Sequence, residues 1–413
     1  MFSIKLGLKN LTRQKRRNGI TILVIAFAFF IYLFLDSVMG GMEELSFNNI
    51  INFETGNIQV AYPQYWEERE ELPLENLIYL NQDIEESIKN MDGLLATSPE
   101  LRFTASLNNG NDEIAVIGLG IVPERYNEVY TTQQYLVAGS MFASGESKAV
   151  IGERLAELMD LKVNDYITLL IRTKEETFNT IDLEIGGLVN TPHPVINNGI
   201  VFVPLDIAQQ ALNVENGISM ITIRTNKEKE IIPIIDDINQ IFQKKNTNIK
   251  AYSWRESAKT VIAYSAAQDA ETAVVLTVIL MIGMIGIINN VILSALERTR
   301  EIGMMKALGM REWEIVLVFM IEASGVGIIG GLAGCLLGAA GVGWMVKYGY
   351  DLSYIGGDMS LYGIPILDKI YGVWNLSSFV FIFFFGIVIA LFSSIAPAYW
   401  AAHKDPVEAI YHR

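Results

Sequence analysis

Side chains that commonly act as nucleophiles, general bases or metal ligands are few and far apart in this sequence. The three histidines, His193, His403 and His412, are scattered, and the single cysteine, Cys335, lies in an apolar segment. No His, Cys, Asp and Glu residues share metal-ligand spacing, and no Gly-x-Ser-x-Gly elbow or Gly-x4-Gly-Lys-Ser/Thr phosphate loop occurs. We therefore expect no catalytic residue, no metal site and no bound cofactor in this chain.

Charged side chains are instead concentrated in one short segment, residues 296–314, between two apolar stretches. It reads Glu-Arg-Thr-Arg-Glu-Ile-Gly-Met-Met-Lys-Ala-Leu-Gly-Met-Arg-Glu-Trp-Glu over residues 297–314. Ile302, Met305 and Leu308 recur at helical spacing with charges around them. We expect a short amphipathic helix whose apolar face packs into a groove of a partner protein while the charges fix its register; a solvated connector is the alternative.

The elements that position this segment are four long, nearly charge-free stretches. Each is long enough to cross ~30 Å of hydrocarbon at ~1.5 Å per residue as a helix. Their presence explains why 51% of the 413 residues are hydrophobic. The predicted crossings are residues 19–40, 272–295, 315–346 and 376–402.

The first crossing follows a basic stretch, residues 1–18, predicted to be an amphipathic helix on the inner leaflet. The positive-inside rule then places both termini and residues 296–314 in the cytoplasm, and residues 41–271 and 347–375 outside. A secretory signal is the alternative, but no convincing cleavage site follows, so we expect an uncleaved anchor. The membrane-surface cations are Lys5, Lys9, Arg13, Lys15, Arg16 and Arg17.

Residues 41–271 form the predicted extracytoplasmic domain. They hold 17 Lys and Arg residues against 35 Asp and Glu residues, which excludes the basic stripe that a nucleic-acid partner requires. Short β-rich runs and helical stretches alternate in this region, so an α+β fold is predicted. The expected strands are 55–62, 114–119, 149–151, 166–171, 181–189, 200–203 and 220–224, and the expected helices are 80–90, 153–161, 205–212, 229–244 and 252–271.

An acidic residue and a row of glycines within the apolar stretches indicate how the membrane helices pack. Glu322 lies about two turns from the inner loop and either faces a polar bundle interior or extends toward the headgroups. Glycines at four-residue spacing in the third crossing let another helix approach closely, either the chain's own second crossing or a second copy. These glycines are Gly327, Gly330, Gly331, Gly334 and Gly338.

Several motifs together resemble the MacB/FtsX superfamily of ABC transporter permeases. The run Glu-Arg-x-Arg-Glu-Ile-Gly-x-x-Lys-Ala-Leu-Gly is similar to the coupling helix of that family, and residues 6–17 and 397–410 resemble its N-terminal helix and C-terminal signature. Residues 151–156 and 161–166 resemble its Gly-x-x-Leu-Ala and Gly-Asp pair, with Asn164 replacing the usual glycine. Residues 37–41 and 48–50 resemble the lipoprotein-releasing LolC/LolE branch in particular.

The resemblance implies an integral membrane α-helical protein with an extracytoplasmic α+β domain of MacB periplasmic-core type over 41–271 and an FtsX-like region over 272–413. It also implies a non-catalytic subunit of the cytoplasmic (inner) membrane, partnered by a cytoplasmic ATPase dimer that binds ATP and Mg and by a second permease copy or paralogue. The implied ATPase-coupling residues are Glu297, Arg298, Arg300, Glu301, Ile302, Met305, Lys306, Leu308 and Gly309.

By the same resemblance the function is extraction of lipoproteins from the outer leaflet, with Met39 near the acyl chains. Alternatives are MacB-like export of peptides or drugs, and an FtsX-like regulator of a cell-wall hydrolase. One departure concerns the periplasmic carrier, which the LolC type recruits by an extended hook. Here only residues 172–180 connect the corresponding strands, which is short for a hook.

Overall fold

The computed structural model describes residues 2–11, 13–80, 84–85, 88, 91, 93–226, 231–350 and 369–403, without the side chains of residues 2–5, 8 and 269. The chain divides into two compact units. The first, called here the helical unit, draws its described residues from Met1–Glu43, Tyr264–Asp351 and Lys369–Arg413. The second, called the α/β unit, comprises the described residues of Glu44–Ala263.

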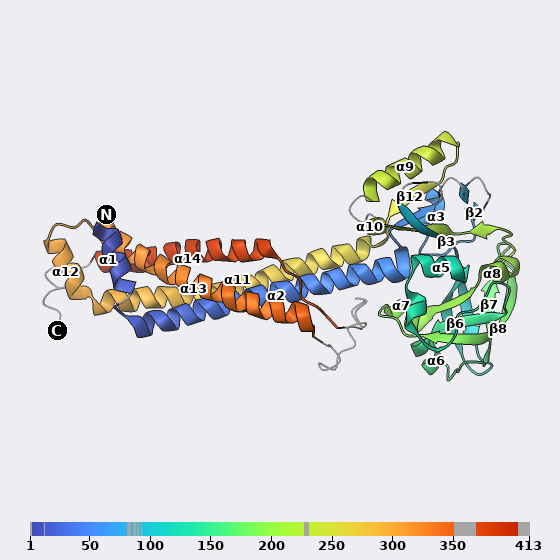
Figure 1. Ribbon diagram of the computed structural model, residues 1–413, viewed down its shortest axis with the longest axis horizontal. Helices are drawn as coiled ribbons and strands as arrows, with labels where there is room; N and C mark the ends of the chain where they lie inside the picture. Colours follow the sequence, from blue (N-terminus) through green and yellow to red (C-terminus); the bar gives the residue numbers. More distant parts are fainter. Residues whose placement is uncertain are drawn as a thin grey trace. The chain divides into compact units, whose positions relative to one another are not determined.

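In the part of the chain that the structure describes, four helices are long and apolar enough to cross a membrane, each containing one of the predicted crossings. In the helical unit they run side by side (Figure 1). This arrangement, with a large α/β region between the first and second helices, confirms the predicted fold class. The helices are α2 (Lys15–Ile50), α11 (Lys259–Glu297), α13 (Glu312–Tyr348) and α14 (Leu376–Ala402).

Two short helices lie at the same end of this bundle, α1 (Phe2–Leu11) and α12 (Thr299–Ala307) (Figure 1). Helix α1 packs closely on α13 because both contribute a glycine to the contact. A side chain at Gly7 would collide with Ile321, and one at Gly325 would collide with Leu11. Helix α12 occupies the middle of the segment predicted to be a short amphipathic helix.

The glycines of α13 pack against the chain's own first and fourth membrane helices, whereas the two partners expected for them were the second crossing and a second copy. Gly330, Gly334 and Gly338 face Ile25, Phe29 and Leu33 of α2, so two rows with four-residue spacing interlock. Gly327 faces Ala390 of α14, and Gly331 lies between Phe29 and Phe383. The complementary signal in the sequence was the row of bulky residues in the first crossing.

Residues 369–375, called here the strap, contact α2. The backbone N–H of Val373 donates to the carbonyl oxygen of Ser37 at 3.1 Å. A side chain on Gly41 would collide with the carbonyl oxygen of Tyr371, and one on Gly372 would meet Ser37 Oγ at 2.5 Å. The small residues of the 37–41 motif therefore leave the space in which this strap packs against α2.

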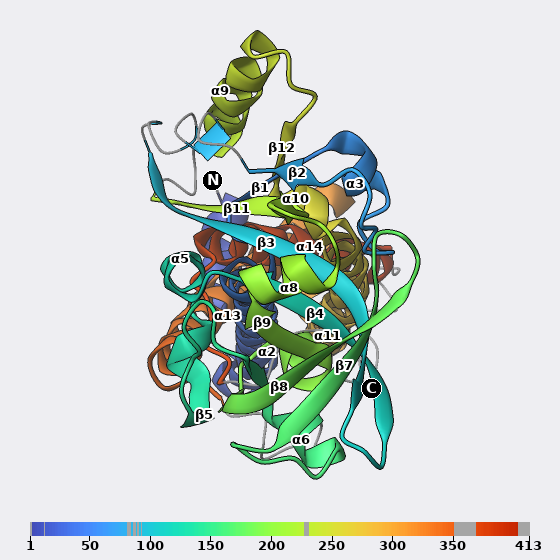
Figure 2. The same ribbon diagram turned by 90° about the vertical axis from the view of Figure 1, so that its right-hand side faces the viewer.

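The α/β unit is built on a ten-stranded mixed sheet whose central strands close into a ring. Strand β3 pairs with β4 and β7, β7 with β8, β8 with β6, β6 with β9, and β9 with β4; only the β4–β9 and β6–β8 pairs are parallel. Most of these strands can be followed in Figure 2. The ring strands are β3 (Leu94–Asn108), β4 (Glu113–Ile121), β6 (Lys148–Gly152), β7 (Tyr166–Arg172), β8 (Phe178–Val189) and β9 (Ile200–Pro204).

The remaining elements extend or cover this ring. Helix α9 is the longest helix that lies wholly in the α/β unit, and one of its faces buries Ile231, Ile234, Ile238 and Phe242. Strands β1, β11 and β12 continue the sheet beyond β3, β5 pairs with β8, and β2 pairs with β10. Their bounds are β1 (Ile58–Ala61), β2 (Ile78–Tyr79), β5 (Leu136–Gly139), β10 (Gly217–Ile218), β11 (Met220–Thr225) and β12 (Lys250–Ser253). The helices are η1 (Ile51–Thr55), α3 (Pro63–Glu67), α5 (Pro123–Val129), η2 (Thr132–Tyr135), α6 (Glu153–Leu158), α7 (Pro194–Gly199), α8 (Leu205–Ala211), α9 (Ile231–Lys244) and α10 (Trp254–Ser257).

The longest strand, β3, is absent from the predicted set. It contains Pro99 and the buried Glu100, which interrupt the alternation of apolar and polar residues that predicts a strand. The predicted helix over residues 252–271 is wrong at residues 252–253, which belong to β12, and it is interrupted, because α10 ends at Ser257 and α11 begins at Lys259. The predicted helix over residues 80–90 lies mostly outside the described residues.

Candidate functional site

Helix α12 is separated from α11 and from α13 by a break in helical backbone geometry at each end. It begins at Arg298, the N-cap residue, whose φ of −108° and ψ of 20° interrupt the helix that precedes it. It ends at Gly309, whose φ of +91° favours glycine. There the backbone N–H groups of Gly309 and Met310 donate to the carbonyls of Lys306 and Met305, which is a Schellman motif.

The apolar side chains of this segment are divided between the interior and the surface. Ile302 is buried and Met305 is half-buried, whereas Leu308 is 85% exposed. Met304 and Trp313, 54% and 61% exposed, lie near Leu308 in the chain and were not singled out from the sequence. Large apolar side chains exposed within a charged segment are typical of a surface that a partner covers. Leu308, Met304 and Trp313 are called here the apolar tip.

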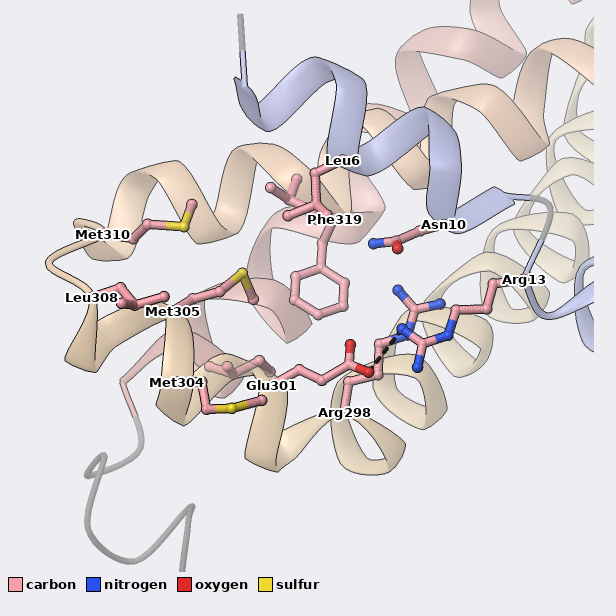
Figure 3. Close-up of a pocket in the computed structure, with 12 residues that line it drawn as sticks. Leu6, Asn10, Arg13, Arg298, Glu301, Met304, Met305, Leu308, Met310 and Phe319 are labelled. Carbon is pink, nitrogen blue, oxygen red and sulfur yellow. Dashed lines mark ion pairs between the residues drawn. The ribbon is translucent and has the colours of Figure 1, made fainter.

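A pocket of about 500 Å³ opens beside the apolar tip, between α1, α12 and α13. Figure 3 shows the three methionines Met304, Met305 and Met310 toward one end and the guanidinium groups of Arg13 and Arg298 toward the other. Methionine side chains adapt to differently shaped apolar groups. The pocket can therefore accept an apolar side chain of a partner protein. Its other lining residues are Leu6, Asn10, Glu301, Ile302, Leu308, Val318 and Phe319.

Three ion pairs between described residues hold α12 to its neighbours. Arg13 pairs with Glu301 at 2.8 Å, and Lys306 pairs with Glu312 of α13 at 3.3 Å. Both pairs reach solvent, so salt screens them and each contributes little to stability. The third pair, Arg298 with Glu322 of α13 at 3.2 Å, is buried, with both side chains only 6% exposed. Of the two predicted environments for Glu322, the structure has the polar bundle interior.

Some of the predicted membrane-surface cations are engaged within the protein. Arg17 donates from Nη1 to Glu297 at 2.7 Å and from Nε to Asn290 at 2.6 Å, and Gln14 donates to the same Glu297 carboxylate at 2.6 Å. Arg13 is occupied by Glu301. Lys9, Lys15 and Arg16 are exposed, as are Arg300 and Gly309 of the coupling set, while the side chain of Lys5 lies outside the described residues.

At the other end of the helical unit, Met39 lies half-buried on α2. Its sulfur accepts a hydrogen bond from Gln268 Nε2 of α11 at 3.9 Å. Close by in the chain, Ser265 Oγ donates to Glu43 at 2.9 Å. These contacts join α2 to α11, and the proximity of Met39 to an acyl chain stays a prediction.

A second buried charge cluster lies in the α/β unit. Glu100, fully buried, accepts hydrogen bonds from Arg102 Nη2 at 2.9 Å and from the Tyr130 hydroxyl at 2.7 Å. Arg102 Nη2 also donates to the carbonyl of Glu54 in η1 at 2.8 Å. The cluster therefore joins η1 to β3 and to the residue after α5.

Burial and neighbouring charge set the protonation of this cluster. Burial raises the pKa of the Tyr130 hydroxyl well above its usual value, and the Glu100 carboxylate raises it further. Burial alone would lower the pKa of the Arg102 guanidinium, but Glu100 and Tyr130 reverse the effect and the pKa is raised. Tyr130 is thus a neutral donor and Arg102 a permanent cation. No group of three His, Cys, Asp or Glu residues in the described ranges is placed to hold a metal ion.

Two family models match successive parts of the chain. Residues 19–241 match the MacB-like periplasmic core domain, and residues 273–406 match the FtsX-like permease C-terminal family. An uncharacterized ABC transporter permease of Methanocaldococcus jannaschii is 20% identical over 98% of this chain and 97% of its own length.

Two relatives carry more specific names. The lipoprotein-releasing system transmembrane protein LolC of Xylella fastidiosa is 22% identical, over 99% of this chain and 98% of its own length. The macrolide export ATP-binding/permease protein MacB of Vibrio parahaemolyticus is 20% identical over 99% of this chain, which spans 59% of that relative.

Proposed function

The chain belongs to the ABC transporter permeases that join a MacB-like periplasmic core domain to an FtsX-like permease region, and on this premise we propose that it moves its cargo by coupling to a separate ATPase chain. ATP and Mg would be bound by that partner. We further propose that the partner is a cytoplasmic ATPase dimer and that a second permease, identical or paralogous, completes the transporter.

The observation that carries this proposal is the apolar tip beside the α1–α12–α13 pocket. A charged segment that exposes Leu308, Met304 and Trp313 next to an open, methionine-lined pocket has the two parts of a protein contact. The exposed groups would enter a groove of the ATPase, and the pocket would receive an apolar side chain from it. This end of the helical unit is then cytoplasmic, in agreement with the basic N-terminal stretch.

For the cargo we propose a membrane-anchored lipoprotein, released from the outer leaflet of the cytoplasmic membrane. Support comes from the LolC relative, which this chain matches along nearly the whole length of both proteins. The MacB relative is matched over 59% of its length, and export of peptides or drugs is the second candidate. The β7–β8 connection is a tight turn in which Thr173 N–H donates to the Thr177 carbonyl at 2.8 Å. It leaves little chain for a carrier-recruiting hook.

The docking proposal is tested by purifying the full chain in mild detergent and identifying the proteins that accompany it by mass spectrometry. Leu308→Asp places a charge in the apolar tip and is expected to abolish recovery of the ATPase. Phe178→Asp, at a similarly exposed apolar side chain of β8, is the matched control and should leave the ATPase bound. Retention of the ATPase by Leu308→Asp would contradict this docking surface.

The same preparation tests the cargo. An acylated polypeptide that accompanies the chain, together with lipoprotein mislocalisation on depletion, would support lipoprotein release. Loss of drug resistance on depletion with lipoproteins in place would favour export. Recovery of an ATPase with a cell-wall hydrolase and no acylated polypeptide would replace both with a regulatory role.

A further inference from the structure

The break between α11 and α12 is a place where the chain could bend. Helix α11 ends at Glu297, and Arg298 leaves helical geometry before α12 begins at Thr299. A lone residue outside helical geometry between two helices is a place where rotation is absorbed most easily. Arg298 itself still donates its N–H to the Ser294 carbonyl at 3.3 Å and accepts from the Ile302 N–H at 3.0 Å. A push on α12 would then be lost in bending unless something fixes the break.

One carboxylate on α13 holds the break residue and the end of α11. Arg298 Nη1 donates to Glu322 Oε2 at 3.2 Å, and Ser294 Oγ, one turn earlier on α11, donates to Glu322 Oε1 at 3.5 Å. Arg298, Glu322 and Ser294 are all buried. The break residue, the end of α11 and the third membrane helix therefore share one point of attachment.

Helix α2 is fastened to the same end of α11. Arg17 bridges Asn290 and Glu297, and the Asn290 amide donates to Asn18 Oδ1 at 3.3 Å. These contacts precede the break and do not reach across it. The Thr299 hydroxyl does reach across the break, donating to the carbonyls of Ala295 and Leu296 at 3.2 and 2.8 Å. Among the ion pairs of the described residues, Arg298–Glu322 attaches the break itself to α13, and Lys306–Glu312 attaches the far end of α12.

The energetics of the pair argue against a role in stability alone. A buried ion pair seldom outweighs the cost of removing its charges from water, and well-packed apolar replacements are often as stable. Among the residues that the structure describes, none accepts a hydrogen bond from Arg298 Nη2, so the pair is incompletely satisfied there. What the pair provides is a fixed direction for the break, in an environment that salt does not screen.

We propose that Arg298 and Glu322 are positioning residues that lock the α11–α12 break, so that α12 moves together with α11 and α13. The consequence, that force from an ATPase reaches the membrane helices through this pair, rests on the proposed function. The lock itself is a property of this chain alone. It is therefore tested without the ATPase.

The test is a pulsed EPR distance measurement on the full chain in detergent. Cys335→Ser removes the single cysteine, and spin labels are placed at Ala307→Cys on α12 and Leu336→Cys on α13, both at exposed positions. A second label pair, Ile285→Cys on α11 with Leu336→Cys, reports the membrane helices alone. We expect one narrow distance distribution for each pair in the otherwise unaltered chain.

Glu322→Gln should broaden or shift the 307–336 distribution and leave the 285–336 distribution unchanged. Because a single change can prevent folding, the second variant combines Arg298→Met with Glu322→Leu, which leaves no unpaired charge; it should show the same loss of the narrow 307–336 distribution. Glu301→Gln, which breaks an exposed pair of the same helix, is the control and should leave both distributions narrow.

An unchanged 307–336 distribution in the folded double variant would overturn the lock, even if its thermal stability fell. A broadened distribution in a chain that binds no ATPase would keep the lock and reject the proposed function. Loss of both narrow distributions would show that the pair only holds the bundle together, and would also overturn the proposal.

Discussion

The two units of this protein each bury a guanidinium–carboxylate pair, and the two pairs are built differently. In the α/β unit, Glu100 receives bonds from Arg102 and Tyr130, and Arg102 also reaches a backbone carbonyl. In the helical unit, Arg298 meets Glu322 through one bond of 3.2 Å and leaves Nη2 without a partner among the described residues. The first pair is set among paired strands, and the second lies at a break between helices.

We infer from this difference that the Glu100–Arg102 pair stabilises the fold of the α/β unit, whereas the Arg298–Glu322 pair fixes the orientation of α12. A satisfied network inside a sheet has a single arrangement of lowest energy. A sparsely satisfied buried pair adds little net stability, so the proposed role of Arg298 and Glu322 is to fix the direction of the break and not to hold the unit folded. The predictions that follow test this contrast, from the largest expected effect to the smallest.

Removing the carboxylate of the α/β unit should have the largest effect. Glu100→Ala leaves the half-buried Arg102 without its counter-charge and the buried Tyr130 without its acceptor, which we expect to cost ~2–4 kcal/mol of unfolding free energy in that unit. Hydrogen exchange on the intact chain measures this loss region by region. A loss below ~1 kcal/mol would mean that the network is not what holds η1 to the sheet.

Replacing both members of each pair by apolar residues sharpens the contrast. Glu100→Leu with Arg102→Met should still cost ~1–3 kcal/mol, because the Tyr130 hydroxyl and the Glu54 carbonyl lose their partners. Arg298→Met with Glu322→Leu should leave the stability of the helical unit unchanged or higher. Thermal unfolding and hydrogen exchange of the two double variants give the comparison directly, and equal losses would remove the distinction.

Alkaline pH should weaken the α/β unit in particular. Burial, followed by the Glu100 carboxylate, raises the pKa of Tyr126 and of Tyr130. A raised folded-state pKa means that stability is complete below the unfolded value of ~10 and declines above it, by up to ~1.4 kcal/mol per pH unit for each group. Urea-dependent proteinase K digestion between pH 9 and 11 measures the decline, and Tyr126→Phe should make it shallower.

Exposed pairs should have the smallest effect. Arg154 and Glu157 on α6 form a 2.8 Å pair whose side chains are 59% and 58% exposed. Arg154→Ala should change the unfolding free energy by at most ~1 kcal/mol, with still less effect at high salt. A larger loss would show that distance, and not burial, decides the value of a charge pair in this protein.

Much of the architecture follows from local patterns in the sequence. The four crossings are long apolar stretches, and the short helix between the second and third is marked by its charges and by Gly309. Several ring strands were also anticipated, since residues 166–171 and 181–189 alternate as β7 and β8 do. Each of these features is determined by neighbouring residues, so one sequence suffices to find it.

The burial of the Arg298 side chain could not be predicted from the same local patterns. Arg298 and Arg300 have the same chemistry in the same charged run, yet one is buried and the other exposed. The difference arises from the break at Arg298 and from Glu322, which lies 24 residues further along the chain. Similarly, the closure of β7 onto β3 depends on a pairing between residues some 60 positions apart. Long-range contacts of this kind have no local signature.

Gly41 shows how packing alone can make a position intolerant of change. The carbonyl of Tyr371 lies where any side chain at residue 41 would begin, and that atom belongs to the backbone of the strap, so no rotamer can relieve the clash. A saturation scan scored by cell survival would consequently rank Gly41 among the least replaceable positions, with even alanine selected against. Such a score would resemble that of a cargo-binding residue, although Gly41 only leaves room for the Tyr371 carbonyl and contributes no side chain.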